Sequence, residues 1–420
     1  MPSAHAIRRV SLFASCSLVV VTWAMLLMVA ATPLAAQGKG PARTPRRPDL
    51  PRGADTCDAN AYYRYGLTIL RGDPETAAAA FYWAERLMPG AAVDYYAERI
   101  ARLIADPNLL RHYVEGDRRS LESAEVRRID SLQVRALSLD PFFPQLLDQN
   151  LILAYYTNLI HDDLRPQGVE VSDLEIELYV RRALDQAGPE TRAWLAFGRG
   201  NYRLAADIWA GTVRHNRKNV ALRARRSQAL FLLGEPDSAR TELDSALAAA
   251  RRSDAEKMKF VYDSKVLWEY EVGRIHELQG HDSAAREAYQ RALVEDLSFH
   301  PAHVRLAYVA LRAGDTTTAV TELQRAIQVK DDDFSARLLL GVVLAARRAL
   351  EPATEQLRRA SEIEPWVAHP HFVLGNVRRD AGDRDGAAAE YRRFLALTVQ
   401  SDPDVDTARQ RLAGLSAPAP

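Results

Sequence analysis

The sequence predicts an all-α protein, a solenoid of antiparallel helix pairs preceded by an N-terminal signal or anchor segment. Small residues recur at intervals of 34 in the second half of the chain. Apolar residues recur every three or four positions, which is the period of an amphipathic helix. No stretch alternates apolar and polar residues for long enough to form a sheet strand. Because one helix pair cannot bury its apolar face alone, pairs repeated at a fixed period are expected to stack.

Residues 1–36 form a candidate export segment. Arg8 and Arg9 precede an uncharged run that ends with Pro33 and small residues before Gln37. A basic start, an apolar middle and a small-residue exit are typical of a secretory signal peptide. We therefore expect an exported protein of the periplasm or bacterial cell envelope. The run is also long enough to span a bilayer, so the alternative is an uncleaved inner-membrane anchor, with membrane association through this segment.

Residues 37–56 are rich in Pro, Gly and Arg and lack apolar periodicity, which predicts a disordered or extended linker that is a plain solvated spacer.

The chain has two cysteines, Cys16 in the apolar run and Cys57 just after the linker. Removal of residues 1–36 leaves Cys57 alone, so we expect no intramolecular disulfide.

The regular repeats lie within residues 220–400. Alanines spaced by 34 residues are Ala285, Ala319, Ala353 and Ala387. Twelve positions before them stand Gly273, Ala307, Gly341 and Gly375, and four positions after them stand Tyr289, Leu323, Leu357 and Tyr391. Turn glycines at 280, 314 and 382 share the period, with Arg348 in the remaining place. Five pattern positions that recur in phase indicate repeated helix–turn–helix units.

This spacing resembles the tetratricopeptide repeat family, in which two helices fill 34 residues and small residues stand where the helices cross. The resemblance implies a right-handed superhelix with units that begin near Val220, Val266, His300, Phe334 and Ala368. Residues 57–219 match more weakly and are expected to be degenerate repeats, and residues 401–420 a capping helix and a frayed tail. At the fourth position of the last four units, polar residues replace the family's large apolar residue, which is expected to loosen packing: Glu269, His303, Arg337 and His371.

The N-terminal half holds the densest group of aromatic residues: Tyr62, Tyr63, Tyr65, Phe81, Tyr82, Trp83, Tyr95 and Tyr96. Core packing between the first helices accounts for most of them, and any ring left exposed would favour a partner contact. Farther along, Phe142 and Phe143 are expected in the core between helices. The stretch His161–Ser172, with Pro166 and Gly168, is expected to be a loop.

No motif in the chain points to catalysis. Phosphate-binding loops, nucleophile turns and haem-attachment motifs are absent, and one remaining cysteine excludes thiolate metal sites. The histidine spacings favour ordinary surface positions over metal ligands. We therefore expect no enzyme, no cofactor and no metal. The 55 basic and 55 acidic residues balance, which gives no reason to expect a nucleic acid partner.

The resemblance implies a protein or peptide partner, because in this family the first helix of each unit lines a concave groove. Carried onto this chain, the groove positions are Arg225, Gln228, Tyr270, Arg274, Arg305, Tyr308, Arg312, Phe372, Asn376 and Arg379. They predict a mildly basic, aromatic trough suited to a peptide with acidic groups. The expected function is a protein-interaction scaffold of the cell envelope. The alternative is a non-catalytic accessory subunit of an envelope enzyme complex, for example in polysaccharide or protein export.

Overall fold

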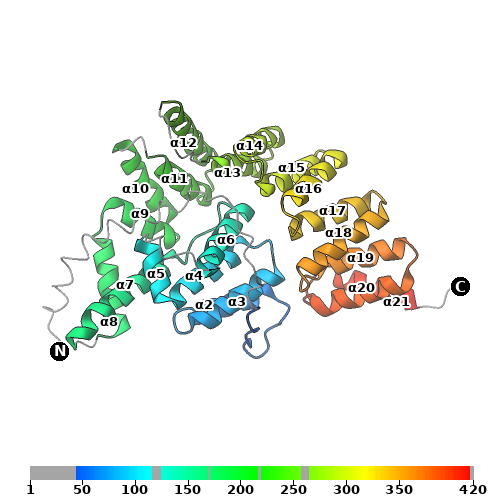
Figure 1. The fold of residues 1–420 in the computed structure, drawn as a ribbon, viewed down its shortest axis with the longest axis horizontal. Coiled ribbons are helices and arrows are strands. Elements are labelled where there is room, and N and C mark those ends of the chain that lie inside the picture. The colour runs from blue at the N-terminus through cyan, green and yellow to red at the C-terminus, as the bar shows by residue number, and fades with distance from the viewer. Residues whose placement is uncertain (1–43, 116–123, 169–170, 216–218, 257–263, 417–420) are drawn as a thin grey trace. The chain divides into compact units, whose positions relative to one another are not determined.

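The computed structural model describes residues 44–115, 124–168, 171–215, 219–256 and 264–416. Within these ranges the chain forms twenty α-helices, one short 3₁₀ helix and no strand (Figure 1). The prediction of an all-α protein is confirmed. The predicted signal segment lies outside the described residues. None of the helices in the described ranges is long and apolar enough to cross a membrane. The chain divides into two compact units.

The first unit contains, among the described residues, 72–78 and Tyr95–Val272. Its helices are most of α4 (Ala92–Ala105), α5 (Pro107–Glu115), α6 (Ala124–Leu139), α7 (Asp148–Leu164), the 3₁₀ helix η3 (Arg165–Gln167), α8 (Asp173–Asp185), α9 (Pro189–Gly198), α10 (Tyr202–His215), α11 (Val220–Leu232), α12 (Pro236–Glu256) and the first half of α13 (Val266–Leu278). Helices α9 and α10 form one pair, α11 and α12 the next, and α10 packs on α11. The loop expected over His161–Ser172 is wrong in its first part, because α7 continues to Leu164 and Pro166 is accommodated in η3.

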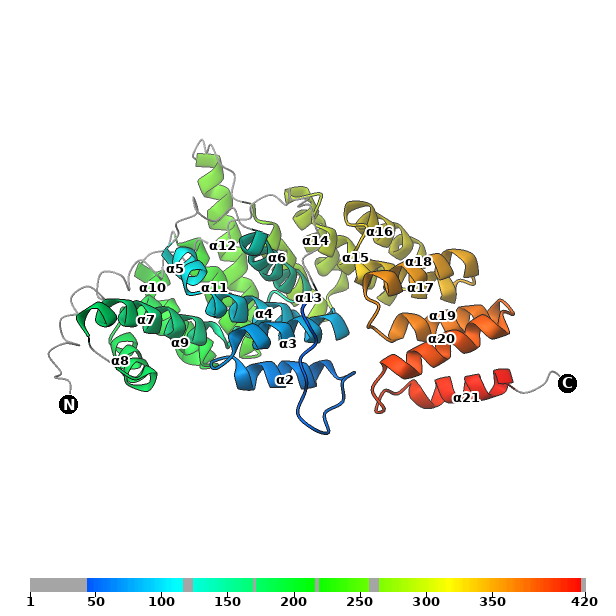
Figure 2. The same cartoon turned by 60° about the horizontal axis from the view of Figure 1, so that its bottom comes forward.

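The second unit contains Pro45–Arg71, Ala79–Asp94 and the described residues from Gly273 onward. Its helices are α2 (Ala59–Ile69), most of α3 (Pro74–Leu87), the second half of α13 (Val266–Leu278), α14 (Asp282–Glu295), α15 (His300–Arg312), α16 (Thr316–Val329), α17 (Phe334–Ala346), α18 (Leu350–Ile363), α19 (His369–Asp380), α20 (Arg384–Leu397) and α21 (Val405–Ser416). Helices α15 to α20 pack as three pairs stacked in chain order (Figures 1 and 2). The predicted solenoid of helix pairs is confirmed.

Small residues allow the two helices of a pair to approach closely. A Cβ atom added at Gly273 would lie 2.4 Å from Cε1 of Tyr289, and one added at Gly375 would lie 2.6 Å from Cε1 of Tyr391. The large ring therefore fills the space that the missing side chain leaves. The turns between the two helices of a pair recur at the same spacing and share a left-handed backbone. Gly314 has φ +75°, and Arg348, at the equivalent place one unit later, has φ 62°.

Polar residues at the fourth position of the units are held by the second helix of the same pair. The partner stands 19 residues later in four pairs: Arg223 with Glu242 at 3.0 Å, His303 with Glu322 at 2.7 Å, Arg337 with Gln356 at 2.9 Å and His371 with Glu390 at 2.7 Å. Glu269 instead pairs with Arg251. The expectation that these residues loosen the packing is therefore wrong, since each one links the two helices of a pair or adjacent helices.

The N-terminal helices pack against C-terminal repeats within the second unit. Nη1 of Arg86 on α3 lies 2.9 Å from Oε1 of Glu364, and the rings of Trp83 and Trp366 meet edge to face with centroids 5.2 Å apart. Four of the eight aromatic residues are buried, as expected for a core: Tyr62, Phe81, Trp83 and Tyr96. Tyr63 and Tyr82 are partly buried and pack on the cluster that contains Tyr62 and Trp83.

Residues 45–50 are held against this aromatic cluster. The guanidinium carbon of Arg47 lies 5.1 Å from the ring centroid of Tyr62, 4.8 Å from that of Trp83 and 5.7 Å from that of Trp366. Nε of Arg47 donates to the Tyr62 hydroxyl at 2.8 Å, and Nε1 of Trp83 donates to the Pro45 carbonyl at 3.2 Å. The described part of the stretch 37–56 has no regular secondary structure. It differs from a plain solvated spacer because Arg47 has an aromatic environment.

Candidate partner-binding surface

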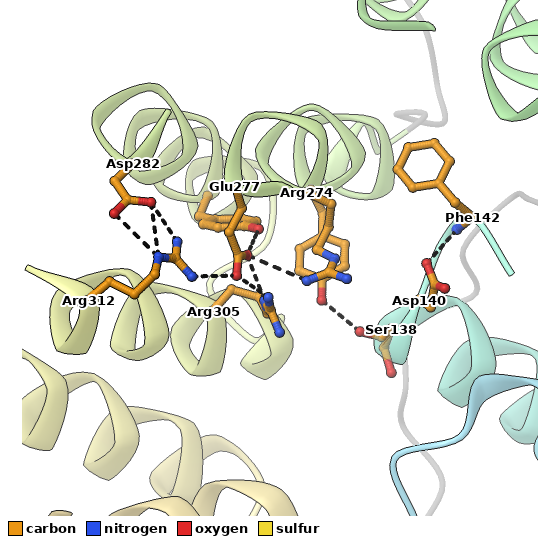
Figure 3. A network of polar contacts seen from close by, with 10 residues as sticks. Ser138, Asp140, Phe142, Arg274, Glu277, Asp282, Arg305 and Arg312 are labelled. Carbon is orange, nitrogen blue, oxygen red and sulfur yellow. Dashed lines mark hydrogen bonds and ion pairs between the residues drawn. The ribbon is translucent and has the colours of Figure 1, made fainter. Parts of the chain in front are cut away.

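The surface that the resemblance assigns to a partner is the exposed side of the first helices of the pairs, called here the first-helix face. In the second unit it is formed by the end of α13 and by α15, α17 and α19. On α15, Arg305 and Arg312 both reach back to Glu277 on α13 (Figure 3). The Nε of Arg305 lies 2.9 Å from Oε2 of Glu277, and Nη1 of Arg312 lies 3.0 Å from Oε1.

Glu277 is the centre of this network. Nη1 of Arg274 lies 3.5 Å from its Oε2, and the Tyr289 hydroxyl donates to Oε2 at 2.5 Å. Burial alone would raise the pKa of Glu277, but the charges and hydrogen bonds of Arg305, Tyr289 and Arg312 leave that pKa below its ordinary value. The carboxylate is therefore held ionised within the helix contact.

The predicted basic character of the trough is reduced by these pairings. Arg312 also donates to Asp282 at 2.7 Å (Figure 3). Three arginines therefore face two carboxylates, which leaves one net positive charge at this end of the face. Tyr308 is 37% exposed and lies beside Arg305, whose guanidinium carbon is 4.9 Å from the ring centroid. Tyr308 is thus an accessible aromatic side chain among the predicted groove residues of α15.

Helix α17 contributes an apolar stretch between α15 and α19. Leu338, Leu339 and Val342 are half-buried on this helix. They hold the fifth, sixth and ninth places of the unit that begins at Phe334, which are groove positions by the same family rule. The groove residues predicted from the sequence are polar and aromatic, so these three aliphatic residues are not among them. The signal that could have found them is the position within the unit.

The predicted residues of α19 have mixed surroundings. Phe372 is buried in a cluster with Tyr391 and Phe394 and does not line an open surface. Oδ1 of Asn376 accepts a hydrogen bond from the Tyr391 hydroxyl at 2.7 Å, and Nη2 of Arg379 lies 2.8 Å from Asp380. Arg379 is therefore the accessible predicted cation at this end of the face.

In the first unit, the predicted groove residues contact a segment of the chain itself. Nε2 of Gln228 donates to the Pro141 carbonyl at 3.1 Å, and the Tyr270 hydroxyl donates to the Ser138 carbonyl at 2.8 Å (Figure 3 draws the second contact). Arg225 lies 3.2 Å from Oε1 of Gln145. Gln228 and Tyr270 are buried. These three positions are therefore covered by a segment of the chain itself, and their assignment to a partner stays a prediction.

In the part of the chain that the structure describes, no group of three or more His, Cys, Asp or Glu side chains is placed to hold a metal ion. The histidines at 303 and 371 are each engaged with a glutamate of the same helix pair. The first-helix face offers an aliphatic stretch between arginine and tyrosine side chains, which suits binding of an amphipathic ligand.

Comparison with known proteins found one family match and several similar structures. Residues 190–255 and 304–365 match the tetratricopeptide repeat family. Three structures are similar: YrrB, described as a TPR protein with an unusual peptide-binding site; PilF of Pseudomonas aeruginosa; and MamA of Desulfovibrio magneticus RS-1. YrrB is 20% identical over 50% of this chain and 100% of its own, with a TM-score of 0.40. PilF is 16% identical over 53% of this chain and 93% of its own, with a TM-score of 0.41.

MamA is 21% identical over 42% of this chain and 94% of its own, with a TM-score of 0.36. A search of curated proteins found no match. The two matched ranges lie on α9–α12 in the first unit and α15–α18 in the second, where the structure forms helix pairs. The matched ranges, which lie in both units, are therefore tetratricopeptide repeats.

Proposed function

We propose that this protein is a non-enzymatic interaction scaffold of the bacterial cell envelope that holds a segment of a partner protein on the first-helix face of α15, α17 and α19. Tetratricopeptide repeats are protein-interaction modules, and one fold hosts many functions. The choice of this face therefore depends on its residues. The placement in the envelope is supported by the signal-like sequence of residues 1–36.

The observation that carries the proposal is the apolar stretch of α17. Leu338, Leu339 and Val342 retain partial exposure although they lie in the middle of a helix stack. Because at most about a third of each side chain is still exposed, covering one of them contributes about 0.5–1 kcal/mol. Tyr308 on one side and Arg379 on the other supply an aromatic ring and a cation. The arrangement suits a partner segment with aliphatic side chains between acidic or hydrogen-bonding groups.

The test is affinity capture of the tagged mature protein from native envelope extract. A Tyr308→Ala, Arg379→Ala double variant removes two accessible groups of the face. A matched control, Arg358→Ala, removes an arginine of α18 that pairs with Glu355 at 2.9 Å. We expect the partner to be captured by the wild type and the control and reduced at least tenfold in the double variant. Equal capture by all three proteins would contradict the assignment of the face.

The envelope location has a separate test. We expect the N-terminus of the mature protein, sequenced after cell fractionation, to begin just after residue 36 and the protein to appear in the envelope fraction. Retention of residues 1–36 in a membrane pellet would support the anchor alternative. A chain found only with the cytoplasmic fraction would contradict export.

A further inference from the structure

A surface cavity of the second unit lies where α18, α19 and α20 meet, helices that stack in chain order (Figure 2). The last turn of α18, the connection to α19, the first turn of α19 and the middle of α20 form its walls. Its volume of about 360 Å³ is in the range of sites for small molecules. None of its residues belongs to the predicted groove. They are Ser361, Pro365, His371, Ala389, Glu390 and Arg393.

Glu390 is fixed in the wall of this cavity by two side chains of α19. Its Oε2 lies 2.7 Å from Nδ1 of His371, and its Oε1 lies 3.5 Å from Nη2 of Arg378. The Glu390 side chain is 17% exposed and lines the cavity. A carboxylate can accept about four hydrogen bonds, so these contacts hold Glu390 in place and leave it able to accept from a ligand.

Arg393 differs from the arginines at the same place in the two preceding helix pairs. Nη1 of Arg325 lies 2.6 Å from Oε1 of Glu322 on the same helix, and Nη1 of Arg359 lies 2.9 Å from Oε2 of Glu362. Arg393 is exposed and forms no hydrogen bond or ion pair with any residue that the structure describes. The last pair therefore presents an unengaged guanidinium at a cavity.

Arg378 explains why the last pair differs. In the α15–α16 pair, Arg325 takes Oε1 of Glu322. In the α19–α20 pair, Arg378 lies beside Oε1 of Glu390 instead, and the equivalent place on α15 is held by Ala310, which has no charge. The arginine at the cavity is thereby left available. A free planar guanidinium suits a carboxylate, which it can bind with two parallel hydrogen bonds.

We propose that this cavity binds a free α-amino acid with a small aliphatic side chain. The guanidinium of Arg393 binds the carboxylate of the ligand, and Glu390 accepts a hydrogen bond from its ammonium group. Pro365 and Ala389 contact its side chain. Because Glu390 and Arg393 are three positions apart on α20, they lie on one face of the helix, which matches the short separation of the two charges in an amino acid.

The polar walls favour a zwitterion over a simple anion. The Ser361 hydroxyl donates to the Arg358 carbonyl at 2.8 Å, so toward a ligand it can only accept a hydrogen bond. Ser361 and Glu390 therefore both call for a donor on the ligand, whereas Arg393 calls for an anion. The Glu390 carboxylate also repels a doubly charged phosphate.

Saturation-transfer NMR titrations of the full mature chain test this site with four compounds. L-Valine carries both charges, isovalerate lacks the ammonium group, L-valinamide lacks the carboxylate, and inorganic phosphate is a plain anion. Arg393→Ala removes the guanidinium, and Ala389→Leu fills the cavity without a change of charge. Both positions are exposed, so both variants are expected to fold. The matched control is Arg325→Ala, which removes the equivalent arginine two pairs earlier.

We expect L-valine to bind the wild type and Arg325→Ala equally, and to bind Arg393→Ala and Ala389→Leu about tenfold or more weakly. Isovalerate and L-valinamide should bind the wild type more weakly than L-valine by a similar factor. The Tyr308→Ala, Arg379→Ala variant should bind L-valine as the wild type does, and Arg393→Ala should still capture the envelope partner. These two results separate the site from the proposed function.

Two kinds of result would overturn the proposal. The first is that L-valine does not bind the wild type, or that it binds Arg393→Ala and Ala389→Leu proteins with wild-type circular dichroism as tightly as the wild type. The second is that phosphate or isovalerate binds as tightly as L-valine, which would show a general anion site without a role for Glu390.

Discussion

Replacing Gly273 with alanine tests how the helix pairs are packed. The new Cβ would lie 2.4 Å from Cε1 and 2.6 Å from Cδ1 of Tyr289, distances that the ring must relieve by moving. The ring has no room to move, because Tyr289 is fully buried and its hydroxyl is held by Glu277 at 2.5 Å. We therefore expect Gly273→Ala to weaken the contact between α13 and α14.

The magnitude follows from two opposing effects. Alanine is favoured over glycine in a helix by about 1 kcal/mol, and overpacking a buried contact costs roughly 1–3 kcal/mol. The rigid ring places the cost near the upper end, so the net destabilisation is about 1–2 kcal/mol. Gly341→Ala meets Leu357 at 2.6 Å instead. The chain accepts alanine in the equivalent place, since Ala307 and Leu323 share one buried cluster. We expect Gly341→Ala to be nearly neutral.

Gly211→Ala is the matched control. Gly211 lies within α10, and an added Cβ there would meet only the end of Arg214 at 4.0 Å. The helix preference then acts alone and should stabilise the protein by about 0.5–1 kcal/mol. Urea unfolding followed by circular dichroism ranks the three variants. Hydrogen exchange of α13 and α14 locates the effect, which matters because repeat arrays need not unfold in one step. Equal stability of Gly273→Ala and Gly211→Ala would refute the packing argument.

Three further predictions concern single side chains. Arg47→Ala should lower the local stability of α2 and α3 by about 1–3 kcal/mol, which would be measured as faster hydrogen exchange of these helices. Unchanged exchange would show that the contacts of Arg47 with the aromatic rings contribute no stability. Burial raises the pKa of Glu271 to about 8, so the folded protein keeps this carboxyl protonated at pH values where the unfolded chain ionises it. The contribution of Glu271 to the free energy of unfolding is therefore complete below the unfolded pKa of 4.5 and is lost as the pH rises to 8. Glu271→Gln should remove roughly 3 kcal/mol of that pH dependence, and identical urea midpoints at pH 5.5 and 8.5 in wild type and variant would contradict this. Arg348→Gly should stabilise the protein by about 1 kcal/mol by relieving the positive φ, and a lower urea midpoint would argue against strain at this turn.

The positions of the regular helices could be predicted from the sequence because the repeat fixes them locally. First helices begin at Val266, His300 and Phe334, where the 34-residue spacing placed them. The close contact of Gly273 with Tyr289 also follows from two positions of the same repeat. Such contacts join neighbouring helices of one pair, whose residues keep a fixed separation in the sequence, so the periodicity is enough to predict them.

The polar pairs between first and second helices were within reach of the sequence. His303 and Glu322 stand 19 residues apart, and the same spacing recurs between His371 and Glu390. Considered alone, a polar residue in place of an apolar one indicates weak packing. Considered with the residue 19 positions later, it indicates a contact between the two helices of a pair.

The remaining site features depend on contacts between distant parts of the chain. The composition around Arg47 predicts a solvated stretch. The ring of Trp366, which Arg47 contacts, lies more than 300 residues away in the sequence, so local composition cannot predict this contact. The occupation of the α11 face by residues 140–147 likewise joins segments about 90 residues apart. Local patterns carry no information on such pairings, so the sequence predicts a groove at Arg225, Gln228 and Tyr270 where the structure places other residues of the chain itself.

Site-specific photo-crosslinking tests most directly whether a partner segment lies on the first-helix face of α15–α19. A photoreactive residue is introduced at position 308 on α15, and in a second protein at position 325 on α16, where Arg325 is exposed and pairs with Glu322 at 2.6 Å. After irradiation in native envelope extract, we expect one adduct of defined mass at position 308 and none at 325. An adduct at 325 alone would contradict the account.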